Sequence, residues 1–222
     1  SDMVKLHIMK LLNEKYGIVE EDFISAELCA VPAFNARDVG LDRSFNFAYN
    51  NLGMTNLVLK KEIELSDGRV DTMSDRDTSP LAMGSLTDGI TVLELTAAYS
   101  AFVNDGQYTT PVLYTAVYDT NDQLIYENKA VTTIAMEQKT RDYMIQLLTG
   151  VVKTGTGAKA AIPGIDVGGK TGTSEKIDVF DENGQRVLDK IVSFVGIAPM
   201  DDPQYIVLVA LDTPSRSAGI YI

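Results

Sequence analysis

Apolar residues gather into two continuous runs in the last part of the chain, Ile191–Pro199 and Tyr205–Asp212. Each run is as long as a strand and rich in valine and isoleucine, which is typical of a strand buried in a sheet. A third stretch, Ile165–Ser174, starts with the apolar Ile165 and Val167 and then turns polar around glycines, hydroxyls and a single lysine. We therefore predict three paired strands here.

Helical spacing of apolar residues predicts two helices in the middle of the chain. In Thr91–Asn104, Thr91 is placed to cap the first turn, and Glu94 completes a capping box. The expected apolar face consists of Val92, Leu95, Ala98, Tyr99 and Phe102. Glu137–Val152 is the second helix, and its expected apolar face consists of Tyr143, Met144, Leu147, Leu148 and Val151.

The first forty or so residues predict a helix followed by a strand. Met3–Tyr16 carries Val4, Ile8, Leu11 and Leu12 on one face, and Gly17 is placed to end the helix. Asp22–Val31 alternates loosely between apolar and polar residues and is interpreted as a strand.

Turn residues define the remaining elements. A hairpin is expected where Val112–Tyr118 and Gln123–Glu127 flank Asp119–Asp122, and a second hairpin is expected in Asp178–Asp189. Ser44–Glu64 is expected to contain a short helix, whereas the polar Leu65–Ser79, with its Asp67-Gly68 turn, is interpreted as a loop.

Composition and charge narrow the function classes. The chain has 222 residues and a formal net charge of −12, which argues against binding to nucleic acid or to an anionic membrane surface. Its one cysteine, Cys29, excludes an internal disulfide. No apolar run approaches the roughly 18 residues of a membrane span, so we expect no membrane anchor in this chain.

The candidate chemistry lies in the Ile165–Ser174 stretch. Lys170 offers a compact positive charge, and the hydroxyls of Thr171 and Thr173 can donate hydrogen bonds. Gly169 and Gly172 have no side chain to block close approach to the backbone. An anionic ligand lying along the strand suits this pattern. By spacing alone, a glycine-rich turn entering a strand explains it equally well.

A family resemblance is carried by this stretch and by the segments on either side of it. The core of the resemblance consists of Val151–Gly157, Gly168–Lys176 and Val192–Pro199. Further matches lie upstream, in Leu81–Thr91 and Ala97–Tyr99, and downstream, in Leu211–Ser215. In order and spacing, residues 44–222 resemble the transpeptidase domain of penicillin-binding proteins. The resemblance implies a partial, β-lactamase-like α+β fold, in which helices flank an antiparallel sheet.

The resemblance also implies a reaction. In that family, a serine in a Ser-x-x-Lys motif attacks a D-alanine carbonyl of a peptidoglycan stem peptide, and β-lactams mimic this substrate. The family's Lys-Thr-Gly strand carries over as Lys170, Thr171 and Gly172, which would bind the substrate carboxylate. The backbone N–H of Thr173 would belong to the oxyanion hole. The implied partners are peptidoglycan stem peptide or β-lactam, and the implied location is the extracytoplasmic face of the bacterial membrane.

The nucleophile motif is missing, because no serine has a lysine three positions further on. We therefore expect this chain to be inactive alone. The literal Ser44-Phe45-Asn46 falls past the family's second motif and is interpreted as chance, and the second Lys-Thr-Gly-Thr, at Lys153–Thr156, is interpreted as structural. His7, the single histidine, makes a serine–histidine–aspartate triad improbable, and Cys29 is interpreted as a small buried hydrophobe.

The N-terminal segment has a different resemblance. Tyr16–Ile18, Glu21–Leu28, Val31–Ala33 and Ala36–Ser44 resemble a stretch of the aspartyl aminopeptidases, which are zinc exopeptidases. That family's paired-aspartate metal motif is not reached, so no metal site and no cofactor are expected. We predict a mosaic of an aminopeptidase-like segment, 1–43, and a partial transpeptidase domain, 44–222.

Two alternatives to a transpeptidase fragment stay open. One is a non-catalytic module that binds cell-wall peptide or associates with itself, and the other is an aminopeptidase-related fragment. The parent domain has a five-stranded sheet and a last helix, of which this chain is expected to keep only three strands. A sheet of three strands exposes its edges, so we expect Phe23–Val31 to pack near it or the chain to form a homo-oligomer.

Overall fold

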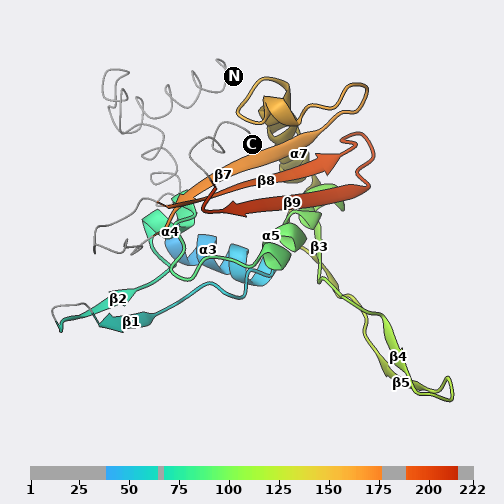
Figure 1. Cartoon of the computed structure of the whole chain (residues 1–222), viewed down its shortest axis with the longest axis horizontal. Coiled ribbons are helices and arrows are strands. Elements are labelled where there is room, and N and C mark those ends of the chain that lie inside the picture. Colours follow the sequence, from blue (N-terminus) through green and yellow to red (C-terminus); the bar gives the residue numbers. More distant parts are fainter. Residues whose placement is uncertain (1–38, 65–67, 177–188, 215–222) are drawn as a thin grey trace.

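The fold is organised around a three-stranded antiparallel sheet. The computed structural model describes residues 39–64, 68–176 and 189–214. Strands β7 (Gly168–Glu175), β8 (Lys190–Ala198) and β9 (Tyr205–Asp212) lie in the order β7-β8-β9 (Figure 1). All three predicted strands are confirmed. Val192, Val195 and Ile197 of the central strand are buried, as expected of a strand paired on both sides.

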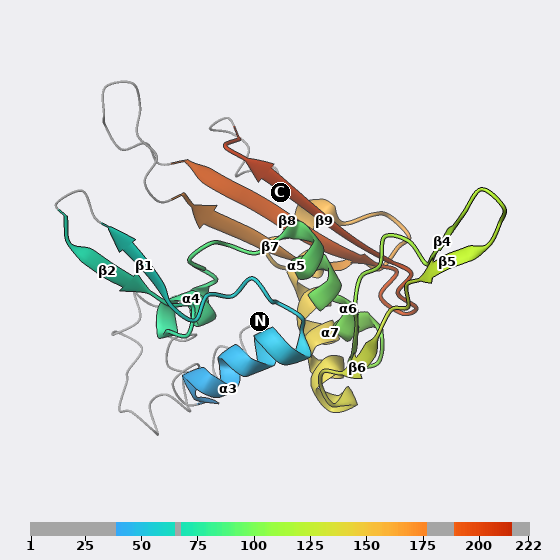
Figure 2. The ribbon, with the colours of Figure 1, turned by 90° about the horizontal axis from the view of Figure 1, so that it is seen from below.

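Two predicted helices pack against this sheet. The first is divided at Tyr99 into α5 (Val92–Ala98) and α6 (Ser100–Val103), and the second is α7 (Gln138–Lys153). In Figure 2, α5 and α7 lie on the near side of the sheet. Leu148 of α7, Ile197 of β8 and Met200 form one buried cluster, which Tyr99, Phe102, Val103, Ile145 and Ile206 extend.

The predicted cap of the first helix is confirmed with a change in its partners. The amide of Glu94 donates to Thr91 Oγ1 at 3.1 Å. The Glu94 carboxylate accepts from the Thr91 hydroxyl and also from the backbone N–H and hydroxyl of Thr55. Glu94 therefore ties the start of α5 to the preceding loop. Asp105 and Gly106, both at positive φ, follow the end of the helical segment.

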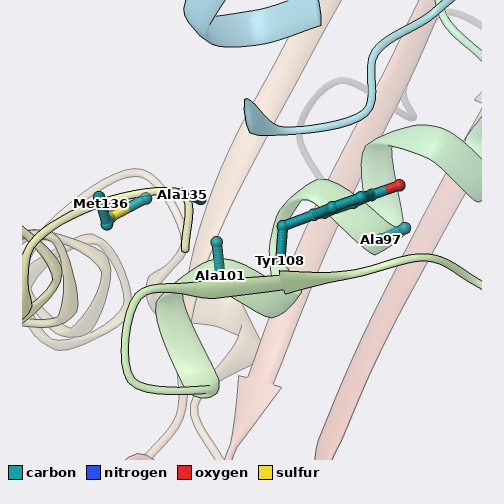
Figure 3. Packing of buried hydrophobic residues seen from close by; sticks show 5 residues of the cluster. All are labelled: Ala97, Ala101, Tyr108, Ala135 and Met136. Carbon is teal, nitrogen blue, oxygen red and sulfur yellow. The ribbon is translucent and has the colours of Figure 1, made fainter. Parts of the chain in front are cut away.

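The expected apolar faces of both helices were partly wrong. Val92 is 54% exposed and Leu147 is 53% exposed. Because the helix is divided at Tyr99, the buried face shifts to Ala97, Ala98 and Ala101. A second buried cluster joins Ala97 and Ala101 to Tyr108, Ala135 and Met136, with Leu52 and Phe102 packed on it (Figure 3).

The predicted loop over Leu65–Ser79 was wrong. This region contains β2 (Val70–Met73), which pairs with β1 (Lys61–Glu64), and the start of α4 (Thr78–Met83). Both strands are mostly exposed, so neither shows the alternation that predicts a strand. The short helix expected in Ser44–Glu64 is confirmed as α3 (Leu41–Asn46), which is continued by η2 (Phe47–Asn51).

A hairpin projects from the body of the domain as predicted. It consists of β4 (Ala116–Tyr118) and β5 (Leu124–Glu127) (Figure 1). Asp119 holds its turn by accepting from the amides of Asn121 and Gln123, both at 2.8 Å. Two further short strands at its base, β3 (Gln107–Thr109) and β6 (Thr132–Ile134), pair with each other, and η3 (Ala158–Ala160) is a single turn after α7.

Several predictions fall on residues outside the described part. They are the helix at Met3–Tyr16, the strand at Asp22–Val31, nearly all of the hairpin at Asp178–Asp189, and the environments of His7 and Cys29. Within the described ranges, the helices are too short or too polar to cross a bilayer.

Candidate ligand-binding edge

Lys170 lies on the outer strand of the sheet. It is the cross-strand neighbour of the buried Val195, so its side chain leaves the sheet on the face that Val195 and Ile197 share. The lysine side chain is exposed, and Nζ donates a hydrogen bond to the carbonyl of Thr171. The ammonium group therefore lies at the edge of the three-stranded ladder rather than away from it.

The backbone of β7 presents free polar groups at the same edge. The Lys176 amide donates to Asp189 O at 2.8 Å, and this fixes which residue pairs of the ladder are hydrogen-bonded. Because such pairs alternate in antiparallel strands, the amides of Gly169, Thr171 and Thr173 point away from β8. In the described part of the chain, no other strand pairs with β7. The outer edge thus combines a cation with a row of donors.

The glycines beside Lys170 have different roles. A Cβ built on Gly169 would lie 2.4 Å from Val195 O and 2.5 Å from Phe194 Cζ, so only glycine fits there. A Cβ on Gly172 would meet only the Ser193 hydroxyl, at 2.5 Å, which is the end of a side chain that can rotate. Gly169 is therefore needed for packing within the sheet, whereas Gly172 leaves space beside the predicted site.

The two Lys-Thr-Gly-Thr segments meet in the structure. Thr156, at the turn after α7, has its hydroxyl 2.8 Å from that of Thr171. Lys153 forms an exposed ion pair with Asp166 at 3.3 Å. The first segment therefore supports the start of β7, which agrees with the structural role predicted for it.

Sequence reasoning missed an electrostatic contact at the end of the sheet where β7 and β9 finish. Lys176 forms an ion pair with Asp212, and its Nζ also donates to Thr213 Oγ1 at 2.9 Å. The hydrogen bond from Lys176, followed by the one from Thr213, lowers the pKa of Asp212. This contact connects the ends of β7 and β9 across β8. The two residues are 36 positions apart, and no sequence motif links them.

A buried carboxylate was also missed. Asp75 is completely buried and accepts from the amides of Val58 at 2.7 Å and Thr87 at 2.6 Å. It joins the segment before β1 to the loop that leads to α5. Its signal in the sequence is weak, since it is one aspartate among several in a polar stretch.

Ser44 and Asn46 do not form a site together. They are two positions apart on α3, so their side chains diverge, and Phe45 between them is 3% exposed. Ser44 instead lines an open, apolar pocket of about 480 Å³, together with Val39, Arg43, Phe47, Ala48 and Leu81. This arrangement agrees with reading Ser44-Phe45-Asn46 as chance.

A metal site has no support in the region that the structure covers. Among residues 39–64, 68–176 and 189–214, histidine, cysteine, aspartate and glutamate side chains do not come together in groups of three or more suited to a metal ion. The described part of the site offers one cation, backbone donors and hydroxyls, which is the chemistry for holding a carboxylate and a peptide backbone.

Fold and site together define an α+β domain whose sheet edge is suited to an extended anionic peptide. The family model described as the penicillin binding protein transpeptidase domain matches residues 33–222. The chain belongs to this family. The match starts ahead of Ser44, and the boundary predicted at 43/44 stays a prediction.

Individual relatives agree with this assignment. The chain is 33% identical over 160 residues to penicillin-binding protein 4 of Bacillus subtilis. The aligned residues make up 68% of this chain and 26% of that relative. The chain thus spans about a quarter of the length of this relative. The crystal structure of the D,D-transpeptidase domain of a peptidoglycan glycosyltransferase from Eggerthella lenta is 26% identical with a TM-score of 0.61, and covers 87% of this chain and 48% of that one.

A second solved structure supports the fold alone. It is penicillin binding protein 3 from Mycobacterium tuberculosis complexed with aztreonam, with a TM-score of 0.64 and 23% identity over 87% of this chain and 47% of that one. The predicted α+β transpeptidase fold is confirmed.

The aminopeptidase resemblance has a short match of its own. A probable M18 family aminopeptidase 1 of Clostridium acetobutylicum is 65% identical over 46 residues, which are 21% of this chain and 10% of that relative. The identity is high, but the aligned segment is short.

Proposed function

We propose that the chain is a partial D,D-transpeptidase-type domain that binds the carboxylate end of a peptidoglycan stem peptide, or a β-lactam, along β7 without being acylated by it. The observation that carries this proposal is the position of the Lys170 ammonium group beside the outward amides of β7. An extended peptide can add to such an edge as a further strand.

Each residue has a role in this proposal. Lys170 attracts the ligand carboxylate, and the Thr171 hydroxyl, already held by Thr156, can turn its proton toward the same group. The amide of Thr173 faces the open edge, where it can donate to a ligand carbonyl. Gly172 leaves room for the ligand backbone. The aztreonam complex of a structural neighbour is consistent with a ligand of this class.

Catalysis is not part of the proposal, because the sequence lacks the Ser-x-x-Lys pair. Acyl transfer needs an attacking oxygen that a nearby base activates. A site that only positions its substrate and holds an oxyanion gives on the order of a thousandfold acceleration over water. The chain should therefore hold its ligand but not turn it over.

A fluorescent penicillin separates these two properties. We expect no labelled band after the chain is incubated with the probe, boiled and run on a denaturing gel, with an intact penicillin-binding protein as the positive control. A band that survives boiling would show that a serine of this chain is acylated, and would overturn the inactive assignment. We further propose that this ligand binding takes place at the extracytoplasmic face of the bacterial membrane, which the similarity to penicillin-binding proteins supports.

A second proposal concerns the N-terminal segment. The short M18 match supports common ancestry of residues 1–43 with aminopeptidases, and we propose that this segment brings no zinc chemistry with it. Elemental analysis of the purified chain should find no stoichiometric zinc. Zinc at one equivalent that survives dialysis would instead favour an aminopeptidase-related function.

A further inference from the structure

The turn that follows α7 is tightly built. The amides of Gly155 and Gly157 both donate to the carbonyl of Val151, at 3.1 and 3.0 Å. A Cβ added to Gly155 would lie 2.9 Å from Val151 O. A Cβ added to Gly157 would lie 3.0 Å from Val151 Cγ1 and 3.2 Å from Phe194 Cε2. Contacts this close to backbone and core side chains leave the turn little freedom. The turn therefore holds Thr156, which lies between the two glycines, in one place.

The Thr156 side chain is exposed, but its hydroxyl reaches β7. Its Oγ1 lies 2.8 Å from Oγ1 of Thr171, and no other hydrogen-bond partner for it is found among the residues that the structure describes. The nearby Thr154 differs, because its hydroxyl donates to the carbonyl of Gly150 in its own helix, at 3.3 Å. An exposed hydrogen bond between neutral hydroxyls contributes only modestly to stability. What the contact fixes most directly is the direction of the Thr171 hydroxyl.

We propose that Thr156 is a positioning residue, which keeps the Thr171 hydroxyl in the rotamer that can donate to the carboxylate of a bound ligand. This inference rests on the proposed function, in which Thr171 contacts that carboxylate. A hydroxyl has one proton to donate. While the pair stays bonded, Thr171 can therefore donate to a ligand only if Thr156 donates to Thr171. A carboxylate accepts hydrogen bonds and does not donate them, so it selects this direction of the pair.

The direction of the pair affects the class of ligand that is bound. The hydrogen bonds from Thr156 to Thr171 and from Thr171 to the carboxylate run in one direction, so each strengthens the other. A C-terminal carboxamide is neutral and accepts a hydrogen bond more weakly than a carboxylate does. Thr156 therefore adds to the preference for a free carboxylate over the corresponding amide.

The rotamers of Thr171 set the size of the effect. Its side chain populates about three staggered rotamers when nothing holds it. If loss of the Thr156 hydroxyl made these equally populated, the competent fraction would fall to about one third, and the apparent affinity would fall by about the same factor. Thr171→Val removes the donor itself and should weaken binding further.

The rotamer of Thr171 can be measured without any ligand. Vicinal couplings of Thr171 in the isotope-labelled 222-residue chain should report a single rotamer in the wild type and in Thr156→Ser, which keeps the hydroxyl. They should report an average over rotamers in Thr156→Val. Thr154→Val is the matched control and should leave them unchanged, because its hydroxyl bonds within α7. Averaged couplings in the wild type, or a single rotamer in Thr156→Val, would overturn the proposal.

Binding provides the second test. The ligands are an N-acetylated peptide that ends in D-Ala-D-Ala and its C-terminal carboxamide, each titrated against the labelled chain. Thr156→Val should bind the free carboxylate about two- to threefold more weakly, with a smaller change for the carboxamide, and Thr156→Ser should bind like the wild type. In a Thr171→Val background, Thr156→Val should change nothing further, because Thr156 acts through Thr171.

The outcomes separate this inference from the function on which it rests. Unchanged carboxylate binding in Thr156→Val would overturn the inference. So would an equal loss with and without the Thr171 hydroxyl, since Thr156 would then only support the structure of β7. An equal loss for both ligands would contradict the preference for a carboxylate. A wild-type chain that does not bind the free carboxylate would refute the proposed function instead, and the couplings would still decide whether Thr156 holds Thr171. Urea unfolding shows whether each variant is folded, and Thr156→Ala replaces Thr156→Val should the latter fail to fold.

Discussion

The hydroxyls of Thr156 and Thr171 lie 2.8 Å apart and join the two Lys-Thr-Gly-Thr segments of the chain. One segment follows α7, and the other forms the edge strand of the sheet. The repeat in the sequence is therefore also a contact in the structure, and it fixes the start of β7 relative to the helix.

This contact predicts a coupling between the two threonines. Thr156→Val and Thr171→Val should each lower the free energy of unfolding by about 0.5–1 kcal/mol, since each removes one partner of the same exposed hydrogen bond. The double variant should cost little more than either single one, because the second substitution has no bond left to break. Urea unfolding of all four proteins measures the coupling, and fully additive losses would count against the contact.

Two glycines should respond in opposite ways to alanine. Gly169→Ala should lower the free energy of unfolding by about 2 kcal/mol or more, because the added Cβ would overlap Val195 O. Gly150, inside α7, has open space around the equivalent position. Gly150→Ala should therefore raise stability by roughly 0.5–1 kcal/mol. Thermal unfolding compares the pair, and a stable Gly169→Ala variant would contradict the described packing of β7 on β8.

The buried Asp75 should be among the most sensitive polar residues of the described part. Asp75→Ala leaves the partly buried amides of Val58 and Thr87 without their acceptor, and should lower the free energy of unfolding by about 3 kcal/mol. Asp75→Asn should restore little of the stability that Asp75→Ala loses, since the nitrogen of the new side-chain amide would face one of the two backbone donors. Asp71→Asn is the matched control, because Asp71 is exposed and accepts only from its neighbour Thr72. Equal effects at both positions would refute the role of Asp75.

The Lys176–Asp212 contact predicts part of the pH dependence of stability. The pKa of Asp212 is lowered by its hydrogen bonds with Lys176 and Thr213. A carboxyl group with a lowered folded-state pKa contributes stability above its unfolded pKa and loses it as pH falls through the folded value. Asp212→Asn should therefore flatten the acid limb of a plot of urea midpoint against pH, and leave the curve unchanged in shape above neutral pH. An acid limb as steep as that of the wild type would contradict the contact.

The central sheet could be predicted from the sequence because β8 and β9 are continuous apolar runs, and the Tyr205–Asp212 boundaries agree with the structure at both ends. Lys170 was placed on the correct strand for the same reason. The β1–β2 hairpin could not be predicted, since exposed strands such as Lys61–Glu64 have no apolar alternation. Nor could the three-residue pairing of β3 with β6, because three residues are too few to show a period.

The helix boundaries show a second limit. Spacing predicted one helix over Thr91–Asn104, but it is divided at Tyr99, where the Phe102 amide donates to the Tyr99 carbonyl instead of continuing the α-helical pattern. Tyr99 packs at this point against the buried cluster that contains Leu148 and Ile197, and such long-range packing leaves no local signal in the sequence. Asp75 and the Lys176–Asp212 pair were missed for the same physical reason, since their partners are distant in sequence.

The central claim is that β7 holds an anionic peptide through Lys170. Its most direct test is a titration of the ¹⁵N-labelled chain with an N-acetylated stem-peptide analogue ending in D-Ala-D-Ala, followed through the amide resonances of Gly169, Thr171 and Thr173. We predict saturable shifts at these amides, binding about tenfold weaker in Lys170→Gln because a charge-assisted contact is lost, and unchanged binding in the matched Lys153→Gln. Shifts that do not saturate, or equal affinity in Lys170→Gln and wild type, would contradict the account.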